Sequence, residues 1–90
     1  MNYLFRSTIP DYVRKQAMDK ANNKCQFPSC TARHALEIHH IDGNEQNNNV
    51  NTNLIVLCSM HRNRARGYRM NELVAWANGQ ISPGRRTDRS

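Results

Sequence analysis

Two pairs of candidate metal ligands constrain this chain more than any other feature of its sequence. Cys25 and Cys30 flank a tight Gln-Phe-Pro-Ser knuckle, and Cys58 and His61 have the spacing C-x-x-H. A structural zinc ion takes four Cys or His ligands. A chain of 90 residues with 38% hydrophobic content has a thin core, and such domains often need a metal to fold. We therefore predict one Cys3His zinc site that joins the two segments.

The cysteine count and the lack of long apolar runs indicate the setting of the chain. Three cysteines do not close into a disulfide framework, and in a reducing compartment clustered Cys and His more often bind zinc. The sequence has no secretory signal and no apolar run of membrane-spanning length, so we predict a cytoplasmic protein without membrane contacts. Two alternatives to the zinc set stay open, namely buried thiols beside a surface histidine, and His34 in place of His61.

The hydrophobic pattern predicts one small α+β domain over residues 1–81 and a basic, disordered tail over 82–90. Segment 7–24 is typical of a helix, with Thr8 and Asp11 placed as a capping box. The predicted order is an N-terminal helix, the Cys knuckle, a β-hairpin, a helix and a C-terminal helix. The core face of the first helix should comprise Ile9, Val13, Ala17 and Ala21.

The predicted hairpin has one half-buried and one fully buried strand. Segment 35–41 alternates apolar and polar residues, whereas segment 53–58 is apolar on both faces. Between them, segment 43–53 holds six asparagines and is too polar for a core element. A helix follows from Ser59, and the last helix should bury a stripe formed by Met70, Leu73, Val74 and Ala77 before it ends at Asn78 and Gly79.

The positive charge of the chain is concentrated after His61. The net charge is +6, and residues 62–90 carry seven arginines against two acidic residues. Arginine binds phosphate through a planar fork of donors, so a nucleic-acid partner is the simple inference. Arg85 and Arg86 in the tail could equally be solubilising charge. The candidate contacts are Arg62, Arg64, Arg66 and Arg69.

Two adjacent histidines end the first predicted strand. His39 and His40 point to opposite sides of a strand, so they should not serve one metal in the same way. A neutral imidazole can take a proton from water near neutral pH, which suits one of them to be a general base and the other a metal ligand. The plain alternative is a pair of hydrogen-bonded or solvated histidines.

Taken together, the segments IPDYVRKQAMDKANNKCQFPSC, LEIHHID and NLIVLCSMH resemble the HNH nuclease family, which has the ββα-metal or His-Me finger fold. The resemblance covers roughly residues 9 to 67. It implies that His40 is the general base and that His39 binds a catalytic Mg²⁺, Mn²⁺ or Ni²⁺. It implies that Asn53 holds the loop or orients the base, and that the zinc knuckle serves stability. DNA is the implied partner, and nucleases of this kind often need a dimer or a larger assembly.

The sequence departs from this family at the helix after Cys58. Many relatives read C-x-x-H-H-x-x-x-H there, and the last two histidines complete the catalytic metal site. Here both positions hold arginine, Arg62 and Arg66, which has no lone pair for a metal. Their spacing of four predicts a shared helix face, turned toward His39 and His40. Either the site binds DNA without cutting it, or the arginines supply the positive charge of the metal, or they replace histidines of a parent sequence.

Three functions therefore stay open. The first is an HNH-type endonuclease that uses His40, and the second is a catalytically degenerate HNH fold that binds nucleic acid. The third is a zinc-stapled protein-interaction domain, which would lack salt-dependent DNA binding.

Overall fold

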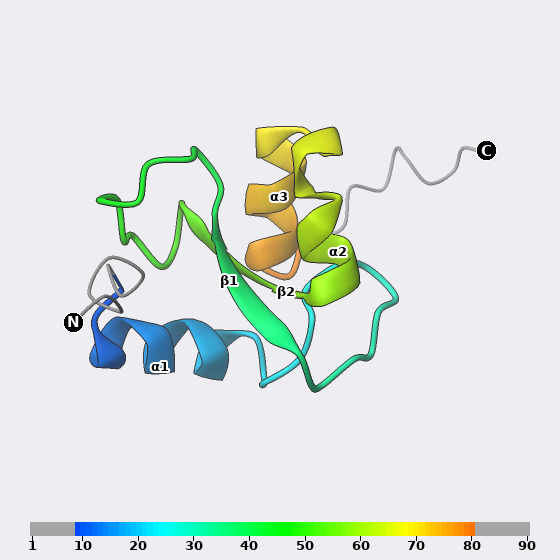
Figure 1. The fold of residues 1–90 in the computed structure, drawn as a ribbon, viewed down its shortest axis with the longest axis horizontal. Helices are drawn as coiled ribbons and strands as arrows, with labels where there is room; N and C mark the ends of the chain where they lie inside the picture. The colour runs from blue at the N-terminus through cyan, green and yellow to red at the C-terminus, as the bar shows by residue number, and fades with distance from the viewer. Residues whose placement is uncertain (1–8, 81–90) are drawn as a thin grey trace.

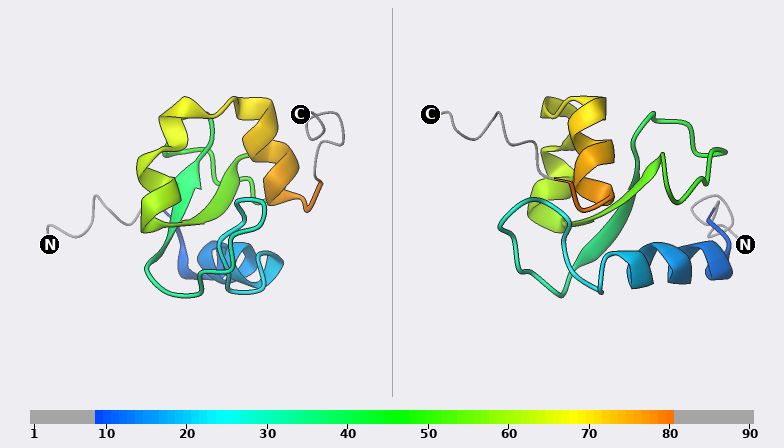
Figure 2. Two further views of the ribbon diagram at one scale, coloured as in Figure 1. Left: turned by 90° about the vertical axis from the view of Figure 1, so that its right-hand side faces the viewer. Right: turned by 180° about the vertical axis from the view of Figure 1, so that it is seen from behind.

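A two-stranded antiparallel hairpin lies between one helix on one face and two helices on the other (Figures 1 and 2). The structure, a computed structural model, describes residues 9–80. The predicted Thr8 cap and the 82–90 tail therefore lie outside the described residues. The strands are β1, Leu36–His40, and β2, Leu54–Cys58. The helices are α1, Asp11–Lys20, α2, Ser59–Asn63, and α3, Met70–Ala77.

The strand β2 is the centre of the core because both of its faces are covered. Leu54 and Val56 pack with the apolar side chains of α1, whereas Ile55 and Leu57 pack with Leu73 and the rest of the α3 side. All five residues of β2 are buried, as its unbroken apolar run predicts. Ile38 of β1 pairs with Val56 of β2, which defines the register of the hairpin. The strand β1 is more exposed than β2.

The helix α1 is shorter than its sequence pattern predicts. Pro10 is the residue before its first turn, and the Pro10 carbonyl accepts the N–H groups of Val13 and Arg14. The helix thus begins three residues after the predicted Thr8 cap, because proline fixes φ and starts the turn itself. At the other end Asn22 and Asn23 have φ of 58° and 53°, which confirms the predicted stop. The predicted core face of α1 is buried.

The predicted helix from Ser59 to Arg66 is broken in two. The helix α2 ends at Asn63, and a 3-10 turn (η2) follows over Ala65–Gly67. The Arg64 N–H donates to the His61 carbonyl and so satisfies one of the carbonyls at the end of α2, and the bonds of the 3-10 turn, such as Tyr68 N–H to the Ala65 carbonyl, have the same i to i+3 spacing. The single continuous helix was therefore a wrong prediction.

The helix α3 buries Leu73 and Ala77 against β2, as predicted. Met70 differs from the prediction, because it is the first residue of α3 and its side chain is 55% exposed. The helix ends as expected at Gly79, where φ is +73° and the N–H of Gln80 donates to the Ala75 carbonyl. Within residues 9–80, the helices are all too short and polar to cross a bilayer.

The first testable prediction concerns the core at β2. Leu57→Ala should lower the free energy of unfolding of the zinc-loaded protein by about 2–5 kcal/mol, because Leu57 is fully buried. The matched control is Met60→Ala on the exposed face of α2, which should change it by less than about 0.5 kcal/mol. Urea denaturation followed by circular dichroism measures both, and equal effects would contradict the assigned core.

A candidate metal centre and a histidine–arginine cleft

The two predicted ligand pairs meet in space. The ligand atoms of Cys25, Cys30, Cys58 and His61 all lie within 4.8 Å of one another, so they could hold a metal ion such as zinc. Nδ1 of His61 is 3.3 Å from Sγ of Cys58 and 3.6 Å from Sγ of Cys25. Zn–S bonds of about 2.3 Å and Zn–N bonds of about 2.0 Å give a tetrahedral S···N edge of about 3.5 Å. The geometry therefore fits a Cys3His set.

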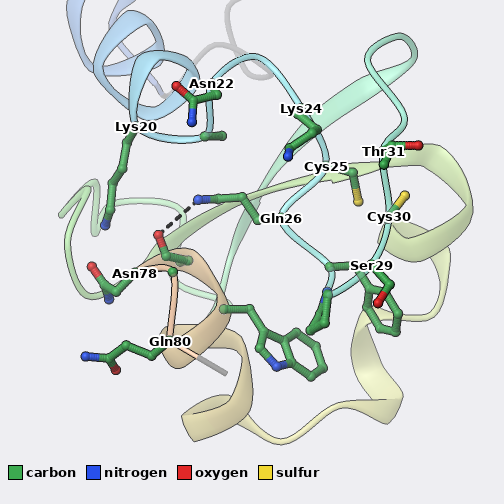
Figure 3. Close-up of a pocket in the computed structure, with 16 residues that line it drawn as sticks. Lys20, Asn22, Lys24, Cys25, Gln26, Ser29, Cys30, Thr31, Asn78 and Gln80 are labelled. Atoms are coloured by element: carbon green, nitrogen blue, oxygen red, sulfur yellow. Dashed lines mark hydrogen bonds between the residues drawn. The ribbon is translucent and has the colours of Figure 1, made fainter. Parts of the chain in front are cut away.

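The knuckle places its two sulfur atoms by a tight turn. The Cys30 N–H donates to the Phe27 carbonyl, and Ser29 has a φ of 72°. Figure 3 shows the Cys25 and Cys30 sulfurs side by side on one side of this turn. Gln26 fastens the knuckle to the core, since its side chain accepts from Val56 N–H at 2.8 Å and donates to the Ala77 carbonyl at 2.9 Å.

The electrostatics of the four side chains also suit a cation. Burial raises the pKa of Cys25 to about 11, so this thiol stays protonated without a positive charge nearby. The backbone N–H of His61 hydrogen-bonds the sulfur of Cys58 and lowers its pKa. Burial, followed by the charge of Arg64, lowers the pKa of His61 and keeps its ring neutral, which is the form that binds metals.

An aromatic cluster holds the ring of His61 in its plane. Phe27 stacks on this ring with a centroid distance of 3.9 Å and an angle of 9°. Trp76 and Tyr68 pack edge-on or tilted against Phe27. Sequence reasoning missed this cluster, because its members lie in three separate segments and show no common spacing.

His34, the alternative fourth ligand, does not reach the sulfur atoms. It is exposed and does not belong to the ligand group that includes His61. The three cysteines are free thiols rather than disulfide partners. The predicted Cys3His set is therefore confirmed as a group that could bind one metal ion.

The second prediction tests this centre. The purified protein should carry one zinc ion per chain, and Cys58→Ala should lose both the zinc and the cooperative thermal transition, because structural zinc contributes folding energy directly. His34→Ala is the matched control and should keep both. Zinc content by mass spectrometry and a melting curve decide the result, and an unchanged melt of a zinc-free protein would contradict the assignment.

The two histidines and two of the arginines line a common cleft on the other side of α2. A hollow of about 390 Å³ is bordered by His39, His40, Arg62 and Arg66, and its lining also includes Tyr68, Met70 and Leu73. We call it the His–Arg cleft. Figure 1 shows α2 lying beside β1, which brings the strand and the arginine-bearing segment together. The expected proximity of both arginines to the histidines is thus found despite the break after Asn63.

Arg62 reaches Glu37 of β1. Its Nε is 3.9 Å from Oε1 of Glu37, and both side chains are about half exposed. Such a loose, solvated pair contributes at most about 1 kcal/mol. The pKa of His39 is lowered by burial first, then by the positive charge of Arg62, and last by the neighbouring imidazole of His40. The His39 ring is therefore a neutral neighbour of the guanidinium.

The ring of His40 is oriented by the asparagine-rich loop. Its Nε2 is 2.9 Å from Oδ1 of Asn48. A neutral imidazole that donates from Nε2 keeps its lone pair on Nδ1. Sequence reasoning missed Asn48, and the only signal for it was the run of asparagines that follows the histidine pair.

Asn53 holds the loop rather than the imidazole. Its buried amide accepts the Asp42 N–H at 2.8 Å and donates to the Asn47 carbonyl at 2.8 Å. The backbone carbonyl of Asn53 accepts the Ile41 N–H at 2.7 Å. Of the two implied roles, holding the loop is the one found, and Asn48 contacts the ring instead.

The His–Arg cleft offers few ligands to a divalent metal. Among residues 9–80, the zinc set is the only group of three or more potential ligands close enough to hold an ion. Asp42 also borders the cleft, but its carboxylate already accepts from Asn44 N–H and from the Asn47 side chain. The two guanidinium groups in the cleft have no lone pair for a metal, so the described side chains there form no second group of potential ligands.

The two other predicted contact arginines lie outside the His–Arg cleft. Arg64 is near His61 and Tyr68, whose pKa values its charge lowers in part. Arg69 precedes α3, and its N–H donates to Oε1 of Glu72 at 3.2 Å. Both arginines are exposed. The four arginines thus do not form one patch around the cleft.

A second hollow of about 400 Å³ is lined by the knuckle itself, including Cys25 and Cys30 (Figure 3). Lys20 and Lys24 line it together with Trp76 and the ends of α1 and α3. Its lining contains no histidine or carboxylate side chain.

Comparison with protein-family models, with curated proteins and with solved structures finds no match to this chain. The geometry of the two sites therefore carries the functional argument.

The third prediction concerns the loop anchor. Asn53→Ala should lower the free energy of unfolding by about 1–3 kcal/mol, because it leaves the Asp42 N–H and the Asn47 carbonyl without their partner. Asn51→Ala is the control. Asn51 is exposed, and its backbone carbonyl, which accepts from the Asn78 side chain, is kept in the variant. Urea denaturation gives the stability, and hydrogen exchange should become faster at the Asp42 amide in Asn53→Ala alone.

Proposed function

We propose that this domain cleaves phosphodiester bonds of nucleic acids in the His–Arg cleft, as a nuclease of the HNH type with an altered site. The observation that carries the proposal is that His40 shares one cleft with the guanidinium groups of Arg62 and Arg66. A nuclease needs a base for the attacking hydroxyl and positive charge for the phosphate, and this cleft brings both together.

His40 is the general base in this proposal. Asn48 accepts from its Nε2 and so leaves Nδ1 free to take a proton. A histidine with a free lone pair at a cleft is suited to deprotonate a hydroxyl nucleophile near neutral pH. Asn53 acts indirectly, because it anchors the loop that carries Asn48.

Arg62 and Arg66 bind the phosphate. Their guanidinium groups stay charged at any physiological pH and match two oxygens of a phosphate at once. Positive groups aimed at the developing charge lower the barrier by stabilising the transition state. Glu37 reaches Arg62 only loosely, so an incoming phosphate can displace it.

The HNH assignment is supported by the order of elements and by the zinc set. The elements occur in the order that the family resemblance implies. The knuckle comes first, then a hairpin whose first strand ends in the paired histidines, then a helix that directly follows the potential zinc ligand Cys58. DNA is the substrate expected from that resemblance, and a dimer or larger assembly remains part of the same expectation.

A second candidate is a domain that binds nucleic acid without cutting it. It is favoured by the same arginines, since they occupy positions where the family resemblance implies metal ligands. Both candidates predict salt-dependent binding, because each phosphate contact releases counterions. They differ in what His40 does.

The fourth prediction separates the two candidates. Zinc-loaded protein should cleave a supercoiled plasmid or an RNA transcript, and His40→Ala should lose at least about a hundredfold in rate, because general-base catalysis contributes about that much. Each polymer is tested with added Mg²⁺, Mn²⁺ or Ni²⁺ and without any. His34→Ala, purified in the same way, should retain the rate and so controls for contaminating nucleases.

Binding of the nucleic acid should persist in His40→Ala but weaken in Arg66→Ala. Arg14→Ala, which removes one positive charge from α1, is the matched control and should weaken binding less. Retarded bands without cleavage of either polymer would establish the binding candidate. No binding to either polymer would overturn both and leave a zinc-stapled interaction domain.

A further inference from the structure

We propose that the substrate of the His–Arg cleft is single-stranded RNA, whose own 2′ hydroxyl attacks the phosphate. This inference rests on the proposed function and names its substrate class. It follows from the composition of the cleft. A candidate base and two candidate phosphate-binding cations are present, but the described side chains there form no group of ligands for a divalent metal.

The choice of nucleophile decides between DNA and RNA. A metal ion lowers the pKa of bound water from about 15.7 to about 7, and a cleft without such an ion must use a weakly acidic water molecule. RNA carries a hydroxyl next to the phosphorus, and well-placed intramolecular nucleophiles reach effective molarities of about 10⁵–10⁸ M. This advantage is available to a site with only imidazole and guanidinium groups, whereas DNA offers no such hydroxyl.

The chemical step is a transesterification. Nδ1 of His40 takes the proton of the 2′ hydroxyl, and the 2′ oxygen forms a bond to phosphorus. Arg62 and Arg66 stabilise the negative charge on the non-bridging oxygens of the five-coordinate phosphorus. The bond from phosphorus to the 5′ oxygen then breaks, and that oxygen takes a proton from water in the open cleft. His40 returns its proton to solvent, which leaves a 2′,3′-cyclic phosphate and a 5′ hydroxyl.

The dimensions of the cleft favour a single strand. Its volume of about 390 Å³ lies at the lower end of the range of about 300–1,000 Å³ for small-molecule pockets. That space suits one sugar and phosphate rather than a duplex. Tyr68 and the exposed Met70 also line the cleft and offer an apolar surface to an unstacked base. A flexible strand can also align its 2′ oxygen with the leaving oxygen, which a duplex resists.

The test uses a DNA oligonucleotide that contains one ribonucleotide. The zinc-loaded protein is incubated with this oligonucleotide, with the all-DNA oligonucleotide of the same sequence and with a version carrying a 2′-O-methyl group at that position. The buffer is freed of other divalent ions on a chelating resin before the protein is added. We expect cleavage only of the first oligonucleotide, on the 3′ side of the ribonucleotide, with a cyclic phosphate that mass spectrometry distinguishes from a 3′ phosphate by one water.

Variants tie the product to the cleft. His40→Ala should reduce the rate at least about a hundredfold, and Arg66→Ala more strongly than Arg14→Ala. If Arg66→Ala fails to fold, as judged by its melting curve and zinc content, Arg66→Lys keeps the charge and should retain part of the rate. Arg62→His combined with Arg66→His should lose metal-free cleavage, because it replaces permanent charge by neutral ligands.

The outcomes separate this inference from the proposed function. Cleavage of the all-DNA and mixed oligonucleotides at equal rates, dependent on His40, would overturn the RNA inference and uphold the nuclease. Binding of all three without cleavage would overturn both in favour of the binding candidate. A cyclic product that persists in His40→Ala would identify a contaminating nuclease and likewise overturn the inference.

Discussion

The whole arrangement depends on the meeting of four side chains at one end of the hairpin. Cys25 and Cys30 come from the knuckle, Cys58 ends β2 and His61 lies in α2. A helix of five residues has no stability of its own, because nucleation of a helix is costly. Binding of a metal ion by these four side chains would hold α2 against β1 and would close the chain around the aromatic stack on Phe27.

The candidate zinc site and the His–Arg cleft are formed by different side chains of the same short helix. The neighbours His61 and Arg62 point to different sites, one to the sulfur cluster and one to the paired histidines. Nothing in the cleft needs to bind a metal for the fold to persist. Permanent charge from arginine can thus occupy positions that would hold ligands in the family resemblance, and the proposed chemistry follows from that exchange.

Much of the fold could be predicted from the sequence because its signals are local. The apolar run of β2, the asparagines after α1 and Gly79 after α3 each specify their structure within a few residues. The break between α2 and the 3-10 turn was not predicted, and Tyr68, which follows the turn, packs on Phe27 of the knuckle, a contact that spacing along the chain does not reveal. Pro10 displaced the predicted start of α1, and Met70 is exposed because the first turn of α3 lies beyond the core.

The candidate site divides in the same manner. Spacing was enough to predict the zinc set, since few other residues could serve as ligands. The partner of His40 was not predictable, because any of six asparagines in the loop could have reached it and only the folded loop selects Asn48. The proximity of Arg62 and Arg66 to the histidines was predicted for a partly wrong reason, a continuous helix that the structure replaces with two short turns.

The adjacency of His61 and Arg62 on so short a helix has one more consequence. In the proposed function, any ligand that holds α2 in place for one site would also organise it for the other, so metal occupancy and phosphate affinity would be thermodynamically linked. The linkage is reciprocal, so a bound polyanion should raise the affinity for the metal by the same factor by which the metal raises the affinity for the polyanion. When zinc is scarce in a cell, loss of the metal would then disorder α2 and lower the proposed activity of the cleft, without any dedicated inhibitor.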